Sequence, residues 1–167
     1  MKYIFLDVDG TIIDHFKKEI PPKTIETIKE LRKNNRLFIA SGRAKDATKI
    51  GLDVEFDGLI ASLGADIYYK DEEIYDKSFT EAEIIKIKDL ASKYQIGISF
   101  ECRHKGFGSE ILLNRVYGRK ANTKLFQSKE KYWYRFDEYT DEKVYKFMAE
   151  TTIENKIAYD LFLKEIK

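Results

Sequence analysis

The stretch KYIFLDVDGT, residues 2–11, decides the fold that the sequence predicts. Its first half is a short continuous run of aromatic, β-branched and other apolar residues that ends at Leu6. Such a run is typical of a strand that is buried on both faces, as in a parallel sheet. Two acids and a glycine then interrupt the run, in the order Asp7, Asp9 and Gly10. The stretch therefore predicts an opening strand that ends in a polar loop.

A helix and a second buried strand follow this loop. Pro21 and Pro22 favour a helix start, because a proline at the first helical position gives up no N–H that the helix needs. Residues 37–40, with the sequence LFIA, predict the second strand, and the tripeptide 41–43, SGR, follows it directly. A strand, a helix and a strand in this length of chain indicate a right-handed parallel crossover. The apolar residues expected on the buried face of the helix lie three positions apart, namely Ile25, Ile28 and Leu31.

The pattern changes after about residue 69. Residues 59–61 predict a third, shorter strand, and residues 68–79 alternate apolar and charged side chains, as in a hairpin or a linker. Thr80 and Glu83 have the spacing of a capping box, which predicts the start of a helix. We therefore expect a domain boundary in this region, with one domain over residues 1–78 and another over residues 79–167. The elements predicted for the second domain are strands over 96–100, 132–136 and 144–148, a helix over 111–117, and a last helix that opens with a second capping box, Thr151 with Glu154, and carries Ile157 and Leu161 on one face.

Composition limits the classes of function. The 167 residues hold 30 Lys and Arg against 29 Asp and Glu, so the formal net charge is only +1 and a globally basic nucleic-acid-binding protein is disfavoured. Cys102 is the single cysteine, which excludes an intrachain disulfide and an all-cysteine metal site, and we expect it to be a small buried residue. No stretch approaches the roughly 18 apolar residues of a membrane span, and the first residues are too short a run for a signal peptide. These features predict a cytoplasmic protein without a membrane partner.

Positive charge gathers in one segment, residues 115–135, which carries seven Lys or Arg against a single acid, Glu130. Three aromatic residues close the segment, at 132–134. Basic and aromatic side chains together are compatible with nucleic-acid binding. Two other interpretations stay open, namely a solvated basic face and a surface that attracts an anionic substrate. We expect one of these two, and a nucleic-acid partner is the less favoured interpretation.

The polar residues after the two predicted strands suit one chemistry. Asp7 and Ser41 each follow a strand, and the carboxyl ends of parallel strands meet at the edge of a sheet where ligands bind. Two carboxylates two positions apart, Asp7 and Asp9, can hold a hard cation and can divide the roles of nucleophile and proton donor. Such groups suit phosphoryl transfer, in which positioning and charge neutralisation do most of the work.

Four further residues complete the candidate site. Gly10 and Gly42 allow the backbone to turn sharply and to present N–H groups to an anion. Thr11 adds a hydroxyl group beside the two acids, and Arg43 is a candidate clamp for a phosphoryl oxygen. The predicted site is therefore built for a small phosphorylated substrate.

These residues also carry a family resemblance. Residues 5–11, FLDVDGT, resemble motif I of the haloacid dehalogenase (HAD) superfamily, and residues 39–43, IASGR, resemble its motif II. The spacing and the mixed α/β character of the later segment are similar to those of the Cof-type phosphatases of subclass IIB. The resemblance implies an α/β fold, a partial HAD-like Rossmannoid parallel core over residues 1–78 with an inserted α+β cap domain over residues 79–167.

The resemblance also implies a mechanism. Asp7 would attack the phosphorus atom and become an aspartyl-phosphate, while Asp9 would protonate the leaving alcohol and then activate water. Mg²⁺ would be held by the Asp7 carboxylate and the backbone carbonyl of Asp9. Ser41 would hydrogen-bond the phosphoryl group, with help from the backbone at Gly10 and Gly42. The implied activity is a Mg²⁺-dependent phosphatase of small phosphorylated metabolites such as sugar phosphates.

Two departures from the family pattern shape a second hypothesis. The motif III lysine and the motif IV acidic pair are not found, and Leu63 stands where the family often has an asparagine before Gly-Ala. The strands that carry those motifs would lie beside the first strand, so we expect a truncated core with an open, apolar sheet edge. The alternative is therefore a weak or inactive homologue that binds phosphate or metal, or that pairs along this edge as a homo-oligomer or with a completing chain. A receiver-like phosphoacceptor domain is disfavoured, because its acids would lie on different strands.

Overall fold

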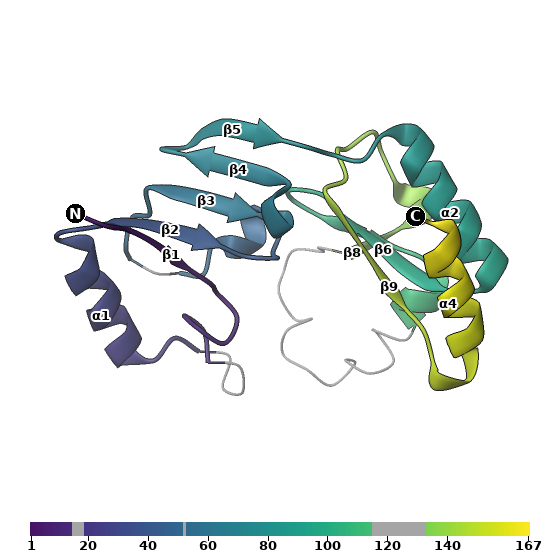
Figure 1. Cartoon of the computed structure of the whole chain (residues 1–167), viewed down its shortest axis with the longest axis horizontal. Coiled ribbons are helices and arrows are strands. Elements are labelled where there is room, and N and C mark those ends of the chain that lie inside the picture. Colours follow the sequence, from purple (N-terminus) through teal and green to yellow (C-terminus); the bar gives the residue numbers. More distant parts are fainter. Residues whose placement is uncertain (15–18, 52, 115–132) are drawn as a thin grey trace. The chain divides into compact units, whose positions relative to one another are not determined.

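The computed structural model describes residues 1–14, 19–51, 53–114 and 133–167. The chain divides into two compact units, Met1–Ser78 and Phe79–Lys167 (Figure 1). Each unit has its own sheet and its own helices. The fold is mixed α/β, and both sheets contain a parallel pair of strands, so the predicted α/β class is confirmed.

The first unit is a five-stranded sheet with the strand order β1-β2-β3-β4-β5. Strands β1, β2 and β3 run parallel, whereas β4 and β5 are antiparallel to their neighbours. The parallel pairing of β1 with β2 across a helix confirms the predicted strand–helix–strand crossover. The elements are β1 (Tyr3–Leu6), α1 (Pro22–Arg32), β2 (Arg36–Ala40), β3 (Gly58–Ala61), β4 (Asp66–Tyr69) and β5 (Glu72–Asp76), with single 3-10 turns at Asp46–Thr48 and Ser62–Gly64.

One face of this sheet is covered by α1. Ile28 of the helix is 3% exposed and packs with Leu37 of β2 and with Ile12, and Leu31 packs against this cluster. Burying a side chain of this size contributes roughly 1.5–3 kcal/mol to stability. The predicted apolar stripe thus holds α1 on the sheet, with Ile28 as its most buried member.

The opposite face of β1 is open in the part of the chain that the structure describes. Tyr3 and Phe5 are 62% and 55% exposed, and Phe5 stacks on Phe38 of β2 with ring centroids 4.9 Å apart. The prediction that the first strand is buried on both faces is therefore wrong. The physical reason is that, among the described residues, no element covers this face of β1 and no strand pairs with its outer edge, while β2, which has a neighbour on either side, is buried as predicted.

The hairpin predicted around residue 70 is present as β4 and β5. Its turn residues, Lys70 and Asp71, both have positive φ, at 49° and 65°. Two consecutive residues in this conformation match the right-handed twist of the paired strands, which is why such turns are favoured in tight hairpins.

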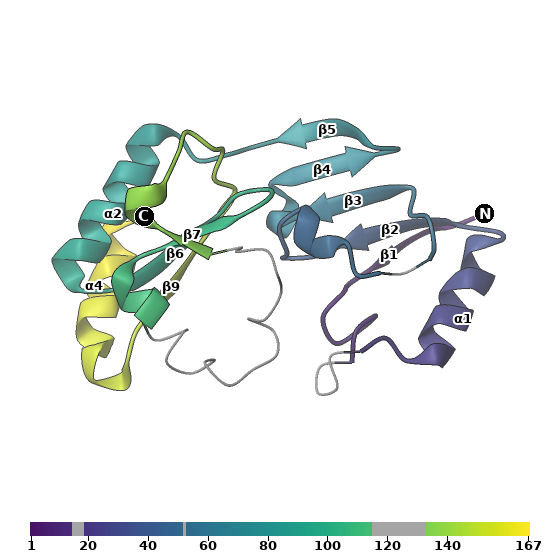
Figure 2. The ribbon, with the colours of Figure 1, turned by 180° about the vertical axis from the view of Figure 1, so that it is seen from behind.

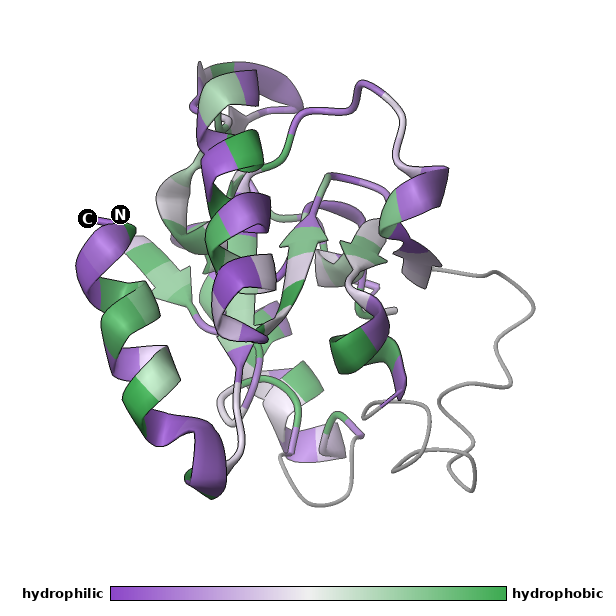
Figure 3. Cartoon of the chain, turned by 90° about the vertical axis from the view of Figure 1, so that its right-hand side faces the viewer, coloured by the Kyte–Doolittle hydropathy of each residue, from purple (hydrophilic) through white to green (hydrophobic). Residues whose placement is uncertain are grey.

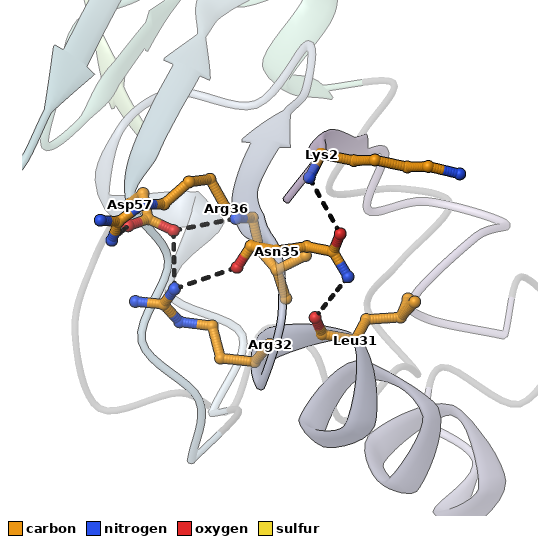
Figure 4. A network of polar contacts seen from close by, with 7 residues as sticks. Lys2, Leu31, Arg32, Asn35, Arg36 and Asp57 are labelled. Carbon is orange, nitrogen blue, oxygen red and sulfur yellow. Dashed lines mark hydrogen bonds and ion pairs between the residues drawn. The ribbon is translucent and has the colours of Figure 1, made fainter.

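A polar network fastens α1 to the starts of three strands (Figure 4). The carboxylate of Asp57, just before β3, accepts hydrogen bonds from Arg36 at 2.8 Å and from the Leu37 N–H at 2.9 Å. It also forms an ion pair with Arg32, at the end of α1, at 2.9 Å. Asn35 joins the same network, because its side chain donates to the Leu31 carbonyl and accepts from the Lys2 N–H. The network lies at the amino ends of the strands.

The second unit is a four-stranded sheet with the order β8-β7-β6-β9. Figure 2 shows α2 and α4 side by side along this sheet, and their buried side chains share one core with Phe100 and Phe107. The capping box predicted at Thr80 is confirmed, since Thr80 Oγ1 accepts from the Glu83 N–H and the Glu83 carboxylate accepts from the Thr80 N–H. The elements are α2 (Glu81–Tyr94), β6 (Gly97–Glu101), β7 (Gly106–Gly108), β8 (Trp133–Arg135), β9 (Lys146–Glu150) and α4 (Lys156–Glu165), with 3-10 turns at Phe136–Glu138 and Ile153–Asn155.

Some predictions for the second unit are wrong in detail. The last helix does not open with a capping box, because Thr151 Oγ1 lies near main-chain carbonyls and α4 begins only at Lys156. Ile157 and Leu161 do not lie on the buried face, since they are 79% and 43% exposed, and Phe162 faces the core instead. Figure 3, which views the side with α2 and α4, shows hydrophobic residues recurring along both helices.

Several predictions meet the limits of the described residues. The helix expected over 111–117 is present at 110–114, and its remainder lies outside them. Most of the basic segment 115–135 also lies outside them, so its three interpretations stay open. Within the described ranges, no helix combines the length and the apolar character that a membrane span requires.

Candidate active site

The carboxyl ends of β1 and β2 place the two predicted loops at the same edge of the sheet. Leu6, the last residue of β1, lies beside Ile39 of β2 in the parallel register. Asp7 follows Leu6 directly, and Ser41 follows β2 directly. The parallel register thus brings together residues that are far apart in the sequence, as predicted from the strand ends.

The loop after β1 is held by its own backbone. The N–H groups of Ile12 and Ile13 donate to the Val8 carbonyl at 3.0 and 2.8 Å, and the Gly10 N–H donates to the Ile13 carbonyl at 2.9 Å. Val8 and Ile12 are fully buried and anchor the loop. Gly10 has a φ of +84°, a conformation that favours glycine, so its role in this loop is the turn itself. The side chains that remain exposed around this turn are those of Asp7, Asp9 and Thr11.

The loop after β2 is packed more tightly. Ser41 is only 7% exposed, and its Oγ accepts a hydrogen bond from the Arg43 N–H at 3.2 Å. A side chain at Gly42 would meet the Leu63 side chain, since an added Cβ would lie 3.1 Å from Leu63 Cδ2. Ser41 therefore offers its hydroxyl from a buried, well-supported position.

A third loop, Ser62–Gly64, supports the second one, and the residue types alone predict no site role for it. The Ser62 N–H donates to the Arg43 carbonyl at 2.9 Å, and the Leu63 N–H donates to the Ser41 carbonyl at 3.3 Å. Ser62, Leu63 and Gly64 all have positive φ, at 50°, 61° and 93°. Only Gly64 signals this conformation in the sequence, so the support by Ser62 and Leu63 could not be read from residue types.

An ion pair joins the first two loops. Arg43 Nε donates to Asp9 Oδ2 at 2.8 Å, and Arg43 Nη2 donates to Asp9 Oδ1 at 2.7 Å, across 34 positions of sequence. The hydrogen bond to Asp9 is the main cause of a raised pKa for Arg43; burial acts against it, and the charges of Asp9 and Asp7 add to it. The guanidinium therefore stays charged, and its Nη1 donates to the Ala47 carbonyl at 2.9 Å.

The acids of the first loop fit a hard cation in part. Among the described residues, no group of three or more His, Cys, Asp or Glu side chains could enclose a metal ion. Mg²⁺, however, is commonly bound by one or two carboxylates, waters and substrate phosphate rather than by a complete protein cage. The exposed Asp7 carboxylate and the backbone carbonyl of Asp9 are donors of the required hard-oxygen type. The residues present thus fit Mg²⁺ as a shared site with substrate.

The first unit also has a cavity of about 450 Å³, which does not include residues 7–11 and 41–43, the segments that carry the predicted site residues. It lies between the sheet, at Leu59 and Tyr68, and the segment that carries Lys45 and Phe56. Lys45 Nζ stands 3.7 Å above the Tyr68 ring. None of the seven predicted site residues lines this cavity, so the exposed loops after β1 and β2 remain the candidate active site.

Comparison with known proteins identifies relatives of the chain. The family model of haloacid dehalogenase-like hydrolases matches residues 4–167. The Bacillus subtilis (strain 168) protein named "Putative phosphatase YkrA" is 36% identical over 94 residues, which are 55% of this chain and 36% of that protein.

Solved structures share the fold. The phosphatase BT1666 from Bacteroides thetaiotaomicron superposes with a TM-score of 0.75 at 19% identity, over 98% of this chain and 60% of that one. The HAD subclass IIB sugar phosphatase BT4131 gives a TM-score of 0.70 at 22% identity, over 99% of this chain and 64% of that one. The chain therefore spans about three fifths of the length of these structures, and the resemblance to the Cof-type, subclass IIB proteins is confirmed at the level of the fold. Because the family model covers nearly all of its residues, the chain belongs to the haloacid dehalogenase-like hydrolases.

Proposed function

We propose that the chain is a phosphatase that hydrolyses small phosphorylated metabolites of the sugar-phosphate type. One observation carries the proposal: the acidic loop after β1 and the Ser41 loop after β2 lie at one sheet edge and are joined by the Asp9–Arg43 pair. The names of two relatives support it, since one is called a phosphatase and another a sugar phosphatase.

The proposed reaction has two steps. In the first, an Asp7 carboxylate oxygen bonds to phosphorus while the bond from phosphorus to the substrate's alcohol oxygen breaks, and the Asp9 carboxyl group gives its proton to that oxygen. In the second, Asp9 takes a proton from water and the water oxygen bonds to phosphorus, while the bond from phosphorus to the Asp7 oxygen breaks and frees the carboxylate and inorganic phosphate. Asp7 is well placed for attack because its side chain is exposed at the end of β1.

The remaining groups orient the phosphoryl group and offset its charge. The Ser41 hydroxyl donates to a phosphoryl oxygen from its buried position. Thr11 and the main chain at Gly42 are the further donors of this proposal. Mg²⁺, held by the Asp7 carboxylate and the Asp9 carbonyl, would supply charge neutralisation, since an anionic nucleophile must approach an anionic phosphate.

Steady-state hydrolysis tests the proposal. We expect Mg²⁺-dependent release of phosphate from p-nitrophenyl phosphate and from at least one sugar phosphate, and a fall in kcat of at least about 10³-fold in Asp7→Asn, because the nucleophile is lost. Asp89→Asn, which removes an exposed carboxylate on α2, is the matched control and keeps full activity. Equal rates for the wild-type chain and Asp7→Asn would exclude the proposed mechanism. Binding of inorganic phosphate without turnover would favour the inactive homologue instead.

A second function is favoured by the edge strand. We propose that β1 pairs with polypeptide that extends the sheet and covers Tyr3 and Phe5. Both rings are more than half exposed on a strand whose outer edge has no neighbour among the described residues. An exposed apolar edge of this kind is a ready template for another strand. The two functions are compatible, because the candidate active site lies at the carboxyl ends of the same strands.

A further inference from the structure

We infer that Arg43 is a positioning residue, which fixes the carboxylate of Asp9, and that it is not the clamp for phosphate that its residue type suggests. The inference deepens the proposed function, because the placement of Asp9 matters to a reaction only if Asp9 transfers the proton.

The guanidinium of Arg43 is directed at Asp9. Nε and Nη2 form the edge of the arginine fork that matches a carboxylate or a phosphate, and both donate to Asp9, at 2.8 and 2.7 Å. The third nitrogen, Nη1, donates to the Ala47 carbonyl at 2.9 Å. Three of the five guanidinium N–H groups therefore have a protein acceptor, and a phosphoryl oxygen could take the Nε/Nη2 edge only by displacing Asp9.

The main chain of Arg43 is also held by hydrogen bonds. Its N–H donates to Ser41 Oγ at 3.2 Å, and its carbonyl accepts from the Ser62 N–H at 2.9 Å. The residue is thus fixed at both ends of its backbone and at the end of its side chain. Because Arg43 is fixed in the loop after β2, its guanidinium also fixes Asp9 in the loop after β1.

The side chain of Asp9 is more exposed than that of Arg43. The side chain of Asp9 is 50% exposed, whereas that of Arg43 is 30% exposed. An exposed aspartate on a loop would sample several rotamers, and the two parallel hydrogen bonds select one of them. Fixing the proton donor before substrate binds reduces the entropy lost in the transition state.

Three measurements on the full chain test the inference. We expect Arg43→Ala to lower kcat for p-nitrophenyl phosphate about 10–100-fold, as for a displaced catalytic group, while the calorimetric Kd for inorganic phosphate in the presence of Mg²⁺ changes less than about threefold. Arg43→Lys keeps the charge but lacks the fork, so it should not restore kcat. Lys49→Ala removes an exposed positive charge from the same segment and serves as the control, with unchanged kcat and Kd.

The third measurement does not depend on turnover or on the folding of an Arg43 variant. In ¹H–¹⁵N spectra, the Arg43 Nε–H signal should be protected from exchange with water in the wild-type chain and should lose this protection in Asp9→Ala, which removes both acceptor oxygens. An increase in the phosphate Kd of about tenfold or more in Arg43→Ala, or recovery of kcat in Arg43→Lys, would overturn the inference. So would an Nε–H signal whose protection from exchange is unchanged in Asp9→Ala. A wild-type chain that is inactive but shows the protected signal would refute the proposed hydrolase and still support the Arg43–Asp9 pairing.

Discussion

At the scale of single residues, Leu63 combines a costly backbone conformation with a structural task. Its φ of 61° and ψ of 27° lie in the left-handed region, which costs a residue with a Cβ roughly 1–2 kcal/mol. Its side chain is 78% exposed, so hydrophobic burial offsets little of this conformational free energy. The conformation directs the Leu63 N–H to the Ser41 carbonyl, which supports the loop after β2.

Leu63→Asn should therefore stabilise the protein. Asparagine tolerates the left-handed region better than a branched apolar residue, and we expect the free energy of unfolding to rise by about 1 kcal/mol in urea titrations. Leu63→Ala is the control, since it also removes the exposed apolar atoms but lacks the short polar side chain through which asparagine tolerates this conformation. Equal stability of the Asn and Ala variants would contradict the expected advantage of asparagine in the left-handed conformation.

Cys102 illustrates how burial removes reactivity at a single residue. The side chain is 1% exposed in the core of the second unit, and burial is the main cause that raises the pKa of its thiol to about 12. Because the thiolate is the reactive form, Cys102 is a small core residue and no nucleophile at neutral pH. The expectation of a small buried cysteine is confirmed.

At the scale of elements, Asp57, which lies just before β3, links the end of α1 to the start of β2. Burial alone would raise the pKa of this carboxyl group, but the Leu37 N–H and the guanidinium groups of Arg36 and Arg32 together hold the pKa below its ordinary value of 3.8. The carboxylate thus serves a strand, a helix end and a loop at once (Figure 4).

Removing this carboxylate should loosen the first unit. We expect Asp57→Ala to lower the free energy of unfolding by about 2–3 kcal/mol at pH 7, because it leaves the Leu37 N–H and two arginines without their acceptor. The pH dependence has a definite sign. A pKa that is depressed in the folded state gives stability that is fully present above the ordinary value and is lost as the pH falls through the folded value.

Urea titrations at pH 6 and pH 3 therefore check both parts of this prediction. The difference in stability between the wild-type chain and Asp57→Ala should be largest at pH 6 and should shrink toward pH 3. Glu72→Ala, at an exposed carboxylate on β5, is the control with little effect at either pH. A difference that is unchanged or larger at pH 3 would contradict the assignment of charge to Asp57.

At the scale of the whole molecule, the edge strand β1 sets the association behaviour that we expect. Tyr3 and Phe5 of β1 contact Phe38 of β2, and their ring centroids lie 6.0 and 4.9 Å from that of Phe38. The solved structures of the same fold extend well beyond the length that this chain covers. If further polypeptide pairs with β1, the isolated chain leaves this aromatic surface in water.

The isolated chain should therefore associate with itself. We expect light scattering after size-exclusion chromatography to give a mass above the 19.6 kDa of one chain. Phe5→Ser should lower the measured mass toward that of a single chain. Ile157→Ser, which replaces an exposed apolar residue on α4, is the matched control and leaves the mass unchanged. A wild-type chain that stays monomeric at high concentration would argue against pairing through β1.

Local sequence alone determined the elements that carry the candidate site and the order of the site residues. The apolar runs before Asp7 and Ser41, the prolines that open α1 and the Thr80 capping box are local signals, because each depends on residues within a few positions of one another. The motifs around Asp7 and Ser41 were also sufficient to indicate the family. Short-range pattern therefore predicted the parallel core and its polar edge.

Only the tertiary structure decided how the site residues are used. The partner of Asp9 is Arg43, 34 positions away, and a residue type alone cannot tell an arginine that binds phosphate from one that holds a carboxylate. Likewise, the exposed face of β1 and the exposed positions of Ile157 and Leu161 follow from which strands and helices lie alongside. Burial and pairing are properties of neighbours brought together by folding, and sequence periodicity marks an apolar face without showing what covers it.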